Sequence, residues 1–222
     1  AFTVYEMATA DLNGDNKADI LVATNDNQLH AIDYQGQYLP NYPVTLPNTN
    51  ITAPLITSDR IIVATINNLY SLDYAGNIIH QFEVSGNPVM PIANDFNNDG
   101  YVDYGFVTST RKLYIVSETG DIFEGFPKLL TKNSQTPVLS TDVNEDEYPE
   151  IICFDSSNNI YIFDYQGNSL PNFPFAANLA TANPATLGDI HGDGDARARG
   201  CIGRVDHQAS VVDGVHERVD LD

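Results

Sequence analysis

Oxygen-bearing side chains recur at alternating positions in one short segment, residues 11–19, with the sequence DLNGDNKAD. Hard oxygen donors at this spacing are typical of a calcium loop, and the absence of histidine and cysteine favours calcium over zinc or copper. The predicted ligands occupy positions 1, 3, 5, 9 and, through a backbone carbonyl, position 7 of the loop: Asp11, Asn13, Asp15, Asp19 and Lys17.

The same pattern returns twice more, so we expect about three calcium ions per chain. The predicted ligands in residues 95–103 are Asp95, Asn97, Asp99, Asp103 and the carbonyl of Tyr101, and those in residues 142–150 are Asp142, Asn144, Asp146, Glu150 and the carbonyl of Tyr148. A fourth segment, DIHGDGDAR, supplies Asp189, His191, Asp193 and Asp195, but it places Arg197 where an acid is expected. We expect this fourth loop to bind calcium weakly or not at all.

Two other interpretations of these loops are a plain turn and a helix-loop-helix or dockerin calcium site. Aspartate, asparagine and glycine are ordinary turn residues, so each loop taken alone could be a turn that binds nothing. Three copies with one spacing favour a metal. A helix-loop-helix calcium site needs a bidentate glutamate at position 12, and a dockerin loop needs a ligand there and a following helix. Position 12 is instead apolar in all three loops, at Val22, Phe106 and Cys153.

The elements that position the loops form a repeat. The phrases LHAIDYQG, LYSLDYAG, LYIVSETG and IYIFDYQG end at Gly36, Gly76, Gly120 and Gly167, which are 40, 44 and 47 residues apart. A repeat of this length indicates a solenoid or a propeller. In three of the four copies a proline follows seven residues after the glycine. The second copy has lost its Asp-rich loop near Asp59, where the sequence is about seven residues shorter.

Each repeat is expected to contain only strands. Short apolar runs such as IIVATI and EIICFD alternate with period two, and no segment shows a helical stripe. The prediction is four antiparallel strands per unit, the last being a short outer strand that ends near the proline. We expect Cys153 to be a core residue, and the aromatic residues expected to pack between units are Tyr70, Tyr114, Tyr161, Phe154 and Phe163.

The DxNxDxxxD loops, the LYxLDxxG phrases and the LPxFP tails together resemble the FG-GAP/VCBS class of repeat. The resemblance implies an all-β β-propeller with four-stranded antiparallel blades and calcium at the blade hairpins. It also implies roles in adhesion, in recognition of proteins or glycans, or in support of a catalytic module elsewhere in a longer chain. The expected blades of the single domain 1–222 are residues 1–47, 48–87, 88–131, 132–177 and 178–222, forming an incomplete or open propeller of four blades and a degenerate fifth.

The last part of the chain departs from the repeat. Every tyrosine and phenylalanine precedes residue 176, whereas four of the six arginines follow residue 196. Gly214 does fall 47 residues after Gly167, in register with a degenerate blade. We nevertheless expect residues 196–222 not to be a native continuation of the blades, and an ordered four-stranded fifth blade would contradict this.

The net charge of the chain excludes some classes of partner. The chain has 30 acidic and 10 basic residues and a formal net charge of −20, which argues against nucleic acid and anionic membranes. No apolar run is long enough to span a membrane and no signal peptide opens the chain, which begins within the repeat pattern and is expected to be a processed piece. The resemblance to FG-GAP/VCBS repeats implies a secreted or cell-surface protein, which binds a protein or glycan ligand and contacts other domains of a longer parent chain.

Catalysis has little support in the sequence. The five histidines fall at different places in the repeat, and no GxSxG or HExxH motif occurs. Quinone-dependent propeller dehydrogenases rely on blade tryptophans, and this chain has none. The prediction is a non-catalytic calcium-binding module for adhesion, recognition or scaffolding. The alternative is the propeller part of a polysaccharide lyase or hydrolase, for which only the pair Arg111 and Lys112 offers basic side chains near an inner strand.

Overall fold

The structure is a computed structural model that describes residues 4–47, 51–134 and 136–176, and every regular element in these ranges is a β-strand. The strands form four four-stranded antiparallel sheets, each built from four consecutive strands. Within the described residues no helix could cross a membrane. The predicted unit 178–222, which includes Cys201, lies outside the described residues.

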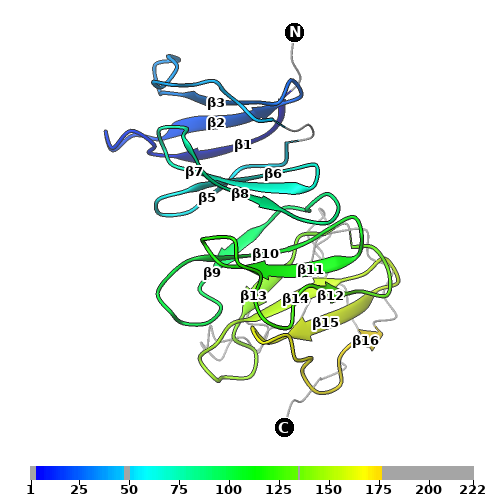
Figure 1. Cartoon of the computed structure of the whole chain (residues 1–222). Coiled ribbons are helices and arrows are strands. Elements are labelled where there is room, and N and C mark those ends of the chain that lie inside the picture. Colours follow the sequence, from blue (N-terminus) through cyan, green and yellow to red (C-terminus); the bar gives the residue numbers. More distant parts are fainter. Residues whose placement is uncertain (1–3, 48–50, 135, 177–222) are drawn as a thin grey trace, which may run out of the picture.

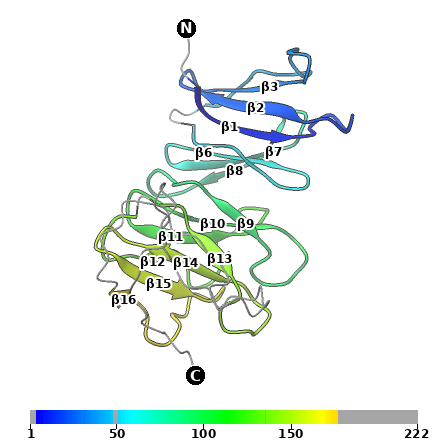
Figure 2. The ribbon, with the colours of Figure 1, turned by 180° about the vertical axis from the view of Figure 1, so that it is seen from behind.

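The four sheets follow one another along the molecule in chain order (Figures 1 and 2). Sheet one contains β1 (Val4–Ala10), β2 (Asp19–Thr24), β3 (Gln28–Ile32) and β4 (Val44–Thr45). Sheet two contains β5 (Leu55–Ile56), β6 (Ile61–Thr65), β7 (Asn68–Leu72) and β8 (Ile78–Glu83). Sheet three contains β9 (Ile92–Asn94), β10 (Asp103–Val107), β11 (Lys112–Val116) and β12 (Lys128–Leu129). Sheet four contains β13 (Leu139–Thr141), β14 (Glu150–Phe154), β15 (Asn159–Phe163) and β16 (Phe175–Ala176).

The hydrophobic core lies between consecutive sheets. Side chains of a strand alternate between its two faces, so Ile61 and Val63 of β6 pack with sheet one, whereas Ile62 and Ala64 pack with sheet three. A third cluster joins sheets three and four, and it contains the free, fully buried Cys153, as predicted. Sheets two and three are therefore covered on both faces.

Most of the aromatic residues expected between units lie there. Tyr70, Tyr114 and Tyr161 belong to the first, second and third clusters, and Phe163 packs against the third. Phe154 lies in none of the three clusters. Repeated tyrosines of the LYxLD phrase thus fill equivalent places between sheets.

The predicted position of the outer strand was wrong. In sheets one, three and four this strand begins after the proline, at Val44, Lys128 and Phe175, rather than ending near it. The segment before the strand pairs with the neighbouring strand through a single bridge, for example Ile32 with Tyr38. Its two prolines cannot donate to a strand ladder, and Asn41 between them has a φ of 68°, so regular pairing stops there.

This irregular segment also joins one sheet to the next. The side-chain amide of Asn41 donates to the carbonyl of Ala75 at 3.2 Å, and the Tyr42 hydroxyl donates to the carbonyl of Tyr74 at 3.2 Å. Both acceptors lie in the turn that follows β7, the third strand of sheet two. Sheet one therefore contacts sheet two through side-chain hydrogen bonds to the backbone of sheet two as well as through apolar packing.

Candidate metal centres

The three predicted calcium loops connect the first strand of a sheet to its second strand, in sheets one, three and four. Each loop ends at its position-9 acid, which is also the first residue of the second strand: Asp19 of β2, Asp103 of β10 and Glu150 of β14. These three acids are almost fully buried, with exposed fractions of 0%, 1% and 0%. Position 12 of each loop lies within the same strand, which rules out a helix-loop-helix site.

One backbone hydrogen bond is common to all three loops. The amide of Leu12 donates to Asp19 Oδ2 at 2.9 Å, that of Phe96 to Asp103 Oδ2 at 3.0 Å, and that of Val143 to Glu150 Oε2 at 2.8 Å. The donor in each case precedes the acid by seven residues. This bond holds the position-9 carboxylate against the base of its loop.

The second oxygen of the buried acid differs between loops. Asp19 Oδ1 and Asp103 Oδ1 are buried without any hydrogen-bond partner among the described residues. Glu150 Oε1 instead accepts a hydrogen bond from Asn144 Nδ2 at 3.1 Å. A buried carboxylate oxygen without a partner is costly and uncommon in folded proteins. A bound cation would satisfy it.

The acids at position 1 organise the rest of the loop. Asp11 accepts backbone hydrogen bonds from Gly14 at 2.7 Å, Asp15 at 3.1 Å and Asn16 at 2.8 Å. Asp95 and Asp142 accept equivalent bonds within their own loops. In all three loops the position-5 amide donates to the position-3 side chain, and the position-7 amide donates to the position-5 carboxylate. The loop backbone is therefore ordered by its own carboxylates.

The carboxylates are not gathered round one point. Among the described residues no three side chains of His, Cys, Asp or Glu lie close enough together to hold a metal ion. The carboxylates at positions 1 and 5 accept hydrogen bonds from backbone amides of their own loop. To bind an ion, they would have to exchange some of these hydrogen bonds for contacts with it. The donor set nevertheless fits a hard cation, because it is made only of oxygen and because two loops leave a buried carboxylate oxygen unsatisfied.

The electrostatics of the buried acids also fit a hard cation. Burial raises the pKa of Asp103 to about 7, and the carboxylates of Asp99 and Asp95 add to the effect while the Phe96 amide opposes it. Burial likewise raises the pKa of Glu150 to about 7. A divalent ion would offset both the lost solvation and the repulsion between the carboxylates.

Sheet two lacks the loop, as predicted. Residues 57–60 connect β5 to β6 through a short turn in which the Thr57 amide donates to the Arg60 carbonyl at 2.9 Å. Within this turn the Arg60 guanidinium lies 2.6 Å from the Asp59 carboxylate. This is the only ion pair among the described residues.

The basic pair considered for an enzyme lies at the turn between β10 and β11. Arg111 lies in the turn between β10 and β11 with a φ of 66°, and its guanidinium donates to the carbonyl of Thr131 at 3.0 Å. Lys112 is the first residue of β11. Of the two histidines in the described residues, His30 is buried beside Tyr38 and His80 stacks on Phe82, so they do not form a cluster.

Two features were missed by the sequence analysis. Asp155, 5% exposed, accepts hydrogen bonds from Thr131 Oγ1 at 2.6 Å, Asn159 Nδ2 at 2.9 Å and the Tyr161 hydroxyl at 3.0 Å. Burial opposes its ionisation, but hydrogen bonds from the Asn159 and Thr131 side chains and from the Asn159 and Ser157 amides prevail and lower the pKa of Asp155 to about 2. The second feature is an open cavity of about 780 Å³ between sheets three and four. No motif marked either feature, because each depends on a contact distant in sequence: Asp155 with Thr131, and one wall of the cavity with the other.

The predicted fourth loop, from Asp189 to Asp195, lies outside the described residues. Its predicted weakness as a calcium site therefore stays a prediction.

No protein-family model and no curated protein sequence matches this chain. Solved structures do match its fold. BBS1N in complex with ARL6DN, from a crystal soaked with lead, superposes with a TM-score of 0.58 and 13% identity, over 85% of this chain and 57% of that one. BamB from Moraxella catarrhalis superposes with a TM-score of 0.55 and 19% identity, over 77% of this chain and 50% of that one.

Both structures are β-propeller proteins, so the chain has a propeller-type fold and its four-stranded sheets correspond to blades. The chain spans only about half the length of these neighbours. At such low identity the likeness concerns the fold alone.

Proposed function

We propose that this chain is a calcium-binding propeller module of the FG-GAP/VCBS type that works outside the cell in recognition, adhesion or scaffolding, without catalysis of its own. One observation carries the proposal: Asp19 Oδ1 and Asp103 Oδ1 are buried at equivalent positions of two repeated loops and have no partner among the described residues. Calcium is the ion that best suits a site built only from carboxylate, amide and carbonyl oxygens.

The role of the ion is structural in this proposal. Bound at positions 1, 3, 5, 7 and 9, it would link the end of one strand to the start of the next and fix the loop between them. Extracellular modules bind calcium with dissociation constants on the order of 0.1 to 1 mM. Sites of this affinity would fill outside cells and stay empty in the cytosol.

A protein partner is supported by the neighbour BBS1N, whose solved structure is a complex with ARL6DN. The net charge of −20 favours a neutral or basic partner over an acidic one. Because the chain spans about half of its structural neighbours, further blades or other domains of a longer parent chain are also proposed contacts.

Thermal unfolding with calcium or with a chelator tests the proposal. At calcium concentrations about ten to a hundred times the dissociation constant, each occupied site should stabilise the fold by about 1.4 to 2.7 kcal/mol. The melting temperature should therefore rise by several degrees in calcium, and magnesium at equal ionic strength is the control. An unchanged melting temperature in calcium and in chelator would contradict the proposal.

A further inference from the structure

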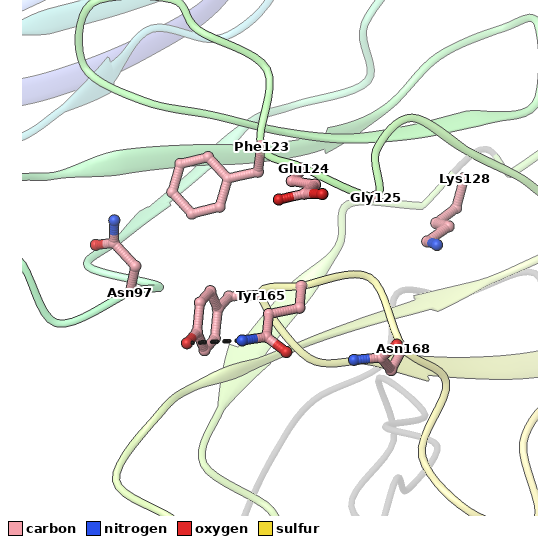
Figure 3. Close-up of a pocket in the computed structure, with 8 residues that line it drawn as sticks. Asn97, Phe123, Glu124, Gly125, Lys128, Tyr165 and Asn168 are labelled. Atoms are coloured by element: carbon pink, nitrogen blue, oxygen red, sulfur yellow. Dashed lines mark hydrogen bonds between the residues drawn. The ribbon is translucent and has the colours of Figure 1, made fainter.

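The open cavity between sheets three and four has a defined construction. One wall is made by Phe123, Glu124, Gly125 and Lys128, and the other by residues 165–168 of the turn after β15. Asn97, from the second predicted calcium loop, stands at one end (Figure 3). A volume of about 780 Å³ lies in the range of small-ligand sites.

Backbone contacts hold the walls in place. A Cβ atom at Gly125, whose φ is 85°, would collide with the carbonyl oxygen of Gln166, so only glycine allows the two walls to approach here. The Phe123 amide donates to the Ile115 carbonyl of β11 at 3.0 Å, which fixes the first wall to sheet three. The Tyr165 ring stacks on Tyr148, with 5.0 Å between centroids. A ligand would therefore meet a largely preformed site and would pay little ordering entropy.

The cavity combines aromatic rings with opposite charges. The partly exposed rings of Phe123 and Tyr165 come from opposite walls, as Figure 3 shows. Glu124 and Lys128 also line the cavity, and neither forms an ion pair with any described residue. The Lys128 ammonium lies 5.9 Å from the ring centroid of Phe126 and 6.0 Å from that of Phe163. The site thus offers apolar faces, one strong acceptor group and one strong donor group.

This chemistry suits a neutral sugar. A pyranose ring has an apolar face of C–H groups and a rim of hydroxyls, which match an aromatic surface edged by hydrogen-bonding groups. The charges of Glu124 and Lys128 cancel within the site, while the chain as a whole carries −20 and repels anionic saccharides.

We propose that the cavity between residues 123–128 and 165–168 binds a neutral pyranose saccharide, with Phe123 and Tyr165 contacting its apolar face and with Glu124 and Lys128 contacting its hydroxyls. The proposal rests on the role of the chain as a recognition module and not on occupation of the calcium loops. It names the ligand class of that module and places it between two blades.

Ligand-observed NMR and calorimetry with methyl glucoside, methyl galactoside and methyl mannoside test the proposal, with methyl glucuronide as the anionic counterpart. We expect at least one neutral glycoside to bind with a dissociation constant on the order of 1 mM, and the glucuronide to bind at least about tenfold more weakly. Tyr165→Ala should weaken neutral glycoside binding at least about tenfold. Tyr34→Ala is the matched control, because Tyr34 lies in the turn after β3, is 52% exposed and does not line the cavity.

A second variant separates loss of binding from loss of folding. Glu124 is exposed, and no hydrogen bond or ion pair joins its side chain to another residue in the described part of the chain. Glu124→Gln should therefore keep the wild-type melting temperature while weakening glycoside binding several-fold. The proposal is overturned if no neutral glycoside binds, if the glucuronide binds equally well, or if both variants bind as the wild type does. Calcium-dependent melting of the same samples is an independent readout, so a retained calcium shift without sugar binding would overturn this proposal alone.

Discussion

Sheet two and sheet three have the same strand order, yet their first hairpins differ in whether the acidic side chains have a cationic partner. In sheet two the short turn contains Asp59 together with Arg60, and the pair is 2.6 Å apart. In sheet three the longer loop contains Asp95, Asp99 and Asp103 and no cationic side chain. The first hairpin supplies its own cation, whereas the second leaves a buried carboxylate oxygen without a partner.

This difference shows what the loop requires. Sheet two forms its four strands without an Asp-rich loop, so the loop is not needed for a blade to fold. The loop is present in three of the four described sheets, where the proposed role is to bind an ion. Four predictions test the contrast, from the largest expected effect to the smallest.

Asp103→Ala should have the largest effect. It removes the acceptor of the buried Phe96 amide, which should cost about 1 to 3 kcal/mol of unfolding free energy in chelator. It should also remove one calcium site and with it about 1.4 to 2.7 kcal/mol of calcium-dependent stability. Denaturant unfolding with and without calcium measures both parts.

Asp103→Asn is the control for this variant. The amide oxygen can still accept from Phe96, while the charge is lost, so the cost in chelator should be small and the calcium-dependent part should still be missing. If Asp103→Asn responds to calcium as the wild type does, Asp103 is not a ligand.

Replacing the loop of sheet one by the turn of sheet two tests the comparison directly. With residues 10–19 exchanged for the sequence of residues 57–60, which the strand register places at the same position, the calcium stoichiometry measured by calorimetry should fall by one ion per chain. The calcium-dependent stability should fall by about 1.4 to 2.7 kcal/mol. An unchanged stoichiometry would mean that the loop of sheet one binds nothing.

Asp155 is a carboxylate that the protein itself satisfies, and it should respond to pH rather than to calcium. Its folded pKa of about 2 lies below its ordinary value of 3.8, so its contribution is present above pH 4 and is lost as the pH falls towards 2. The contribution is about 2 kcal/mol. In unfolding experiments the stability gap between the wild type and Asp155→Asn should narrow over this range, and a gap that is constant from pH 5 to about 2 would contradict the assignment.

Arg60→Ala should have the smallest effect. The pair with Asp59 lies at the surface, where an ion pair is worth about 0 to 1 kcal/mol and is screened by salt. The loss should therefore be barely measurable in unfolding experiments, and it should disappear at high salt. A loss above about 2 kcal/mol would show that the turn depends on its internal cation.

Local sequence was enough to predict the three inner strands of each described sheet and the place of the first three Asp-rich loops, but not the position of the outer strand. The apolar run at Ile61 and the repeated LYxLD phrases follow strand periodicity, which the pleat of a sheet imposes on any sequence. The deleted loop near Asp59 was visible for the same reason, since a repeat fixes what should be present. These predictions depend only on neighbours along the chain.

Side-chain contacts that depend on the folded geometry could not be predicted in this way. The hydrogen bond from Asn144 to Glu150 makes the third loop differ from the other two, although their spacing is the same. The donors of Asp155 include Thr131, which is 24 residues away. The cavity needs the close approach of Gly125 to Gln166, which depends on how two sheets pack. Such features arise from tertiary structure rather than from pattern.

The link from sheet one to sheet two also bears on the order in which the chain folds. Asn41 and Tyr42 reach acceptors only 34 and 32 residues further on, in the sheet that follows directly. Contacts of moderate sequence separation keep the entropy of loop closure low, and nearest-neighbour interfaces let folding spread from any completed unit. A nascent chain could therefore close each blade onto the one just made, so assembly would proceed in the direction of synthesis without waiting for the last blade.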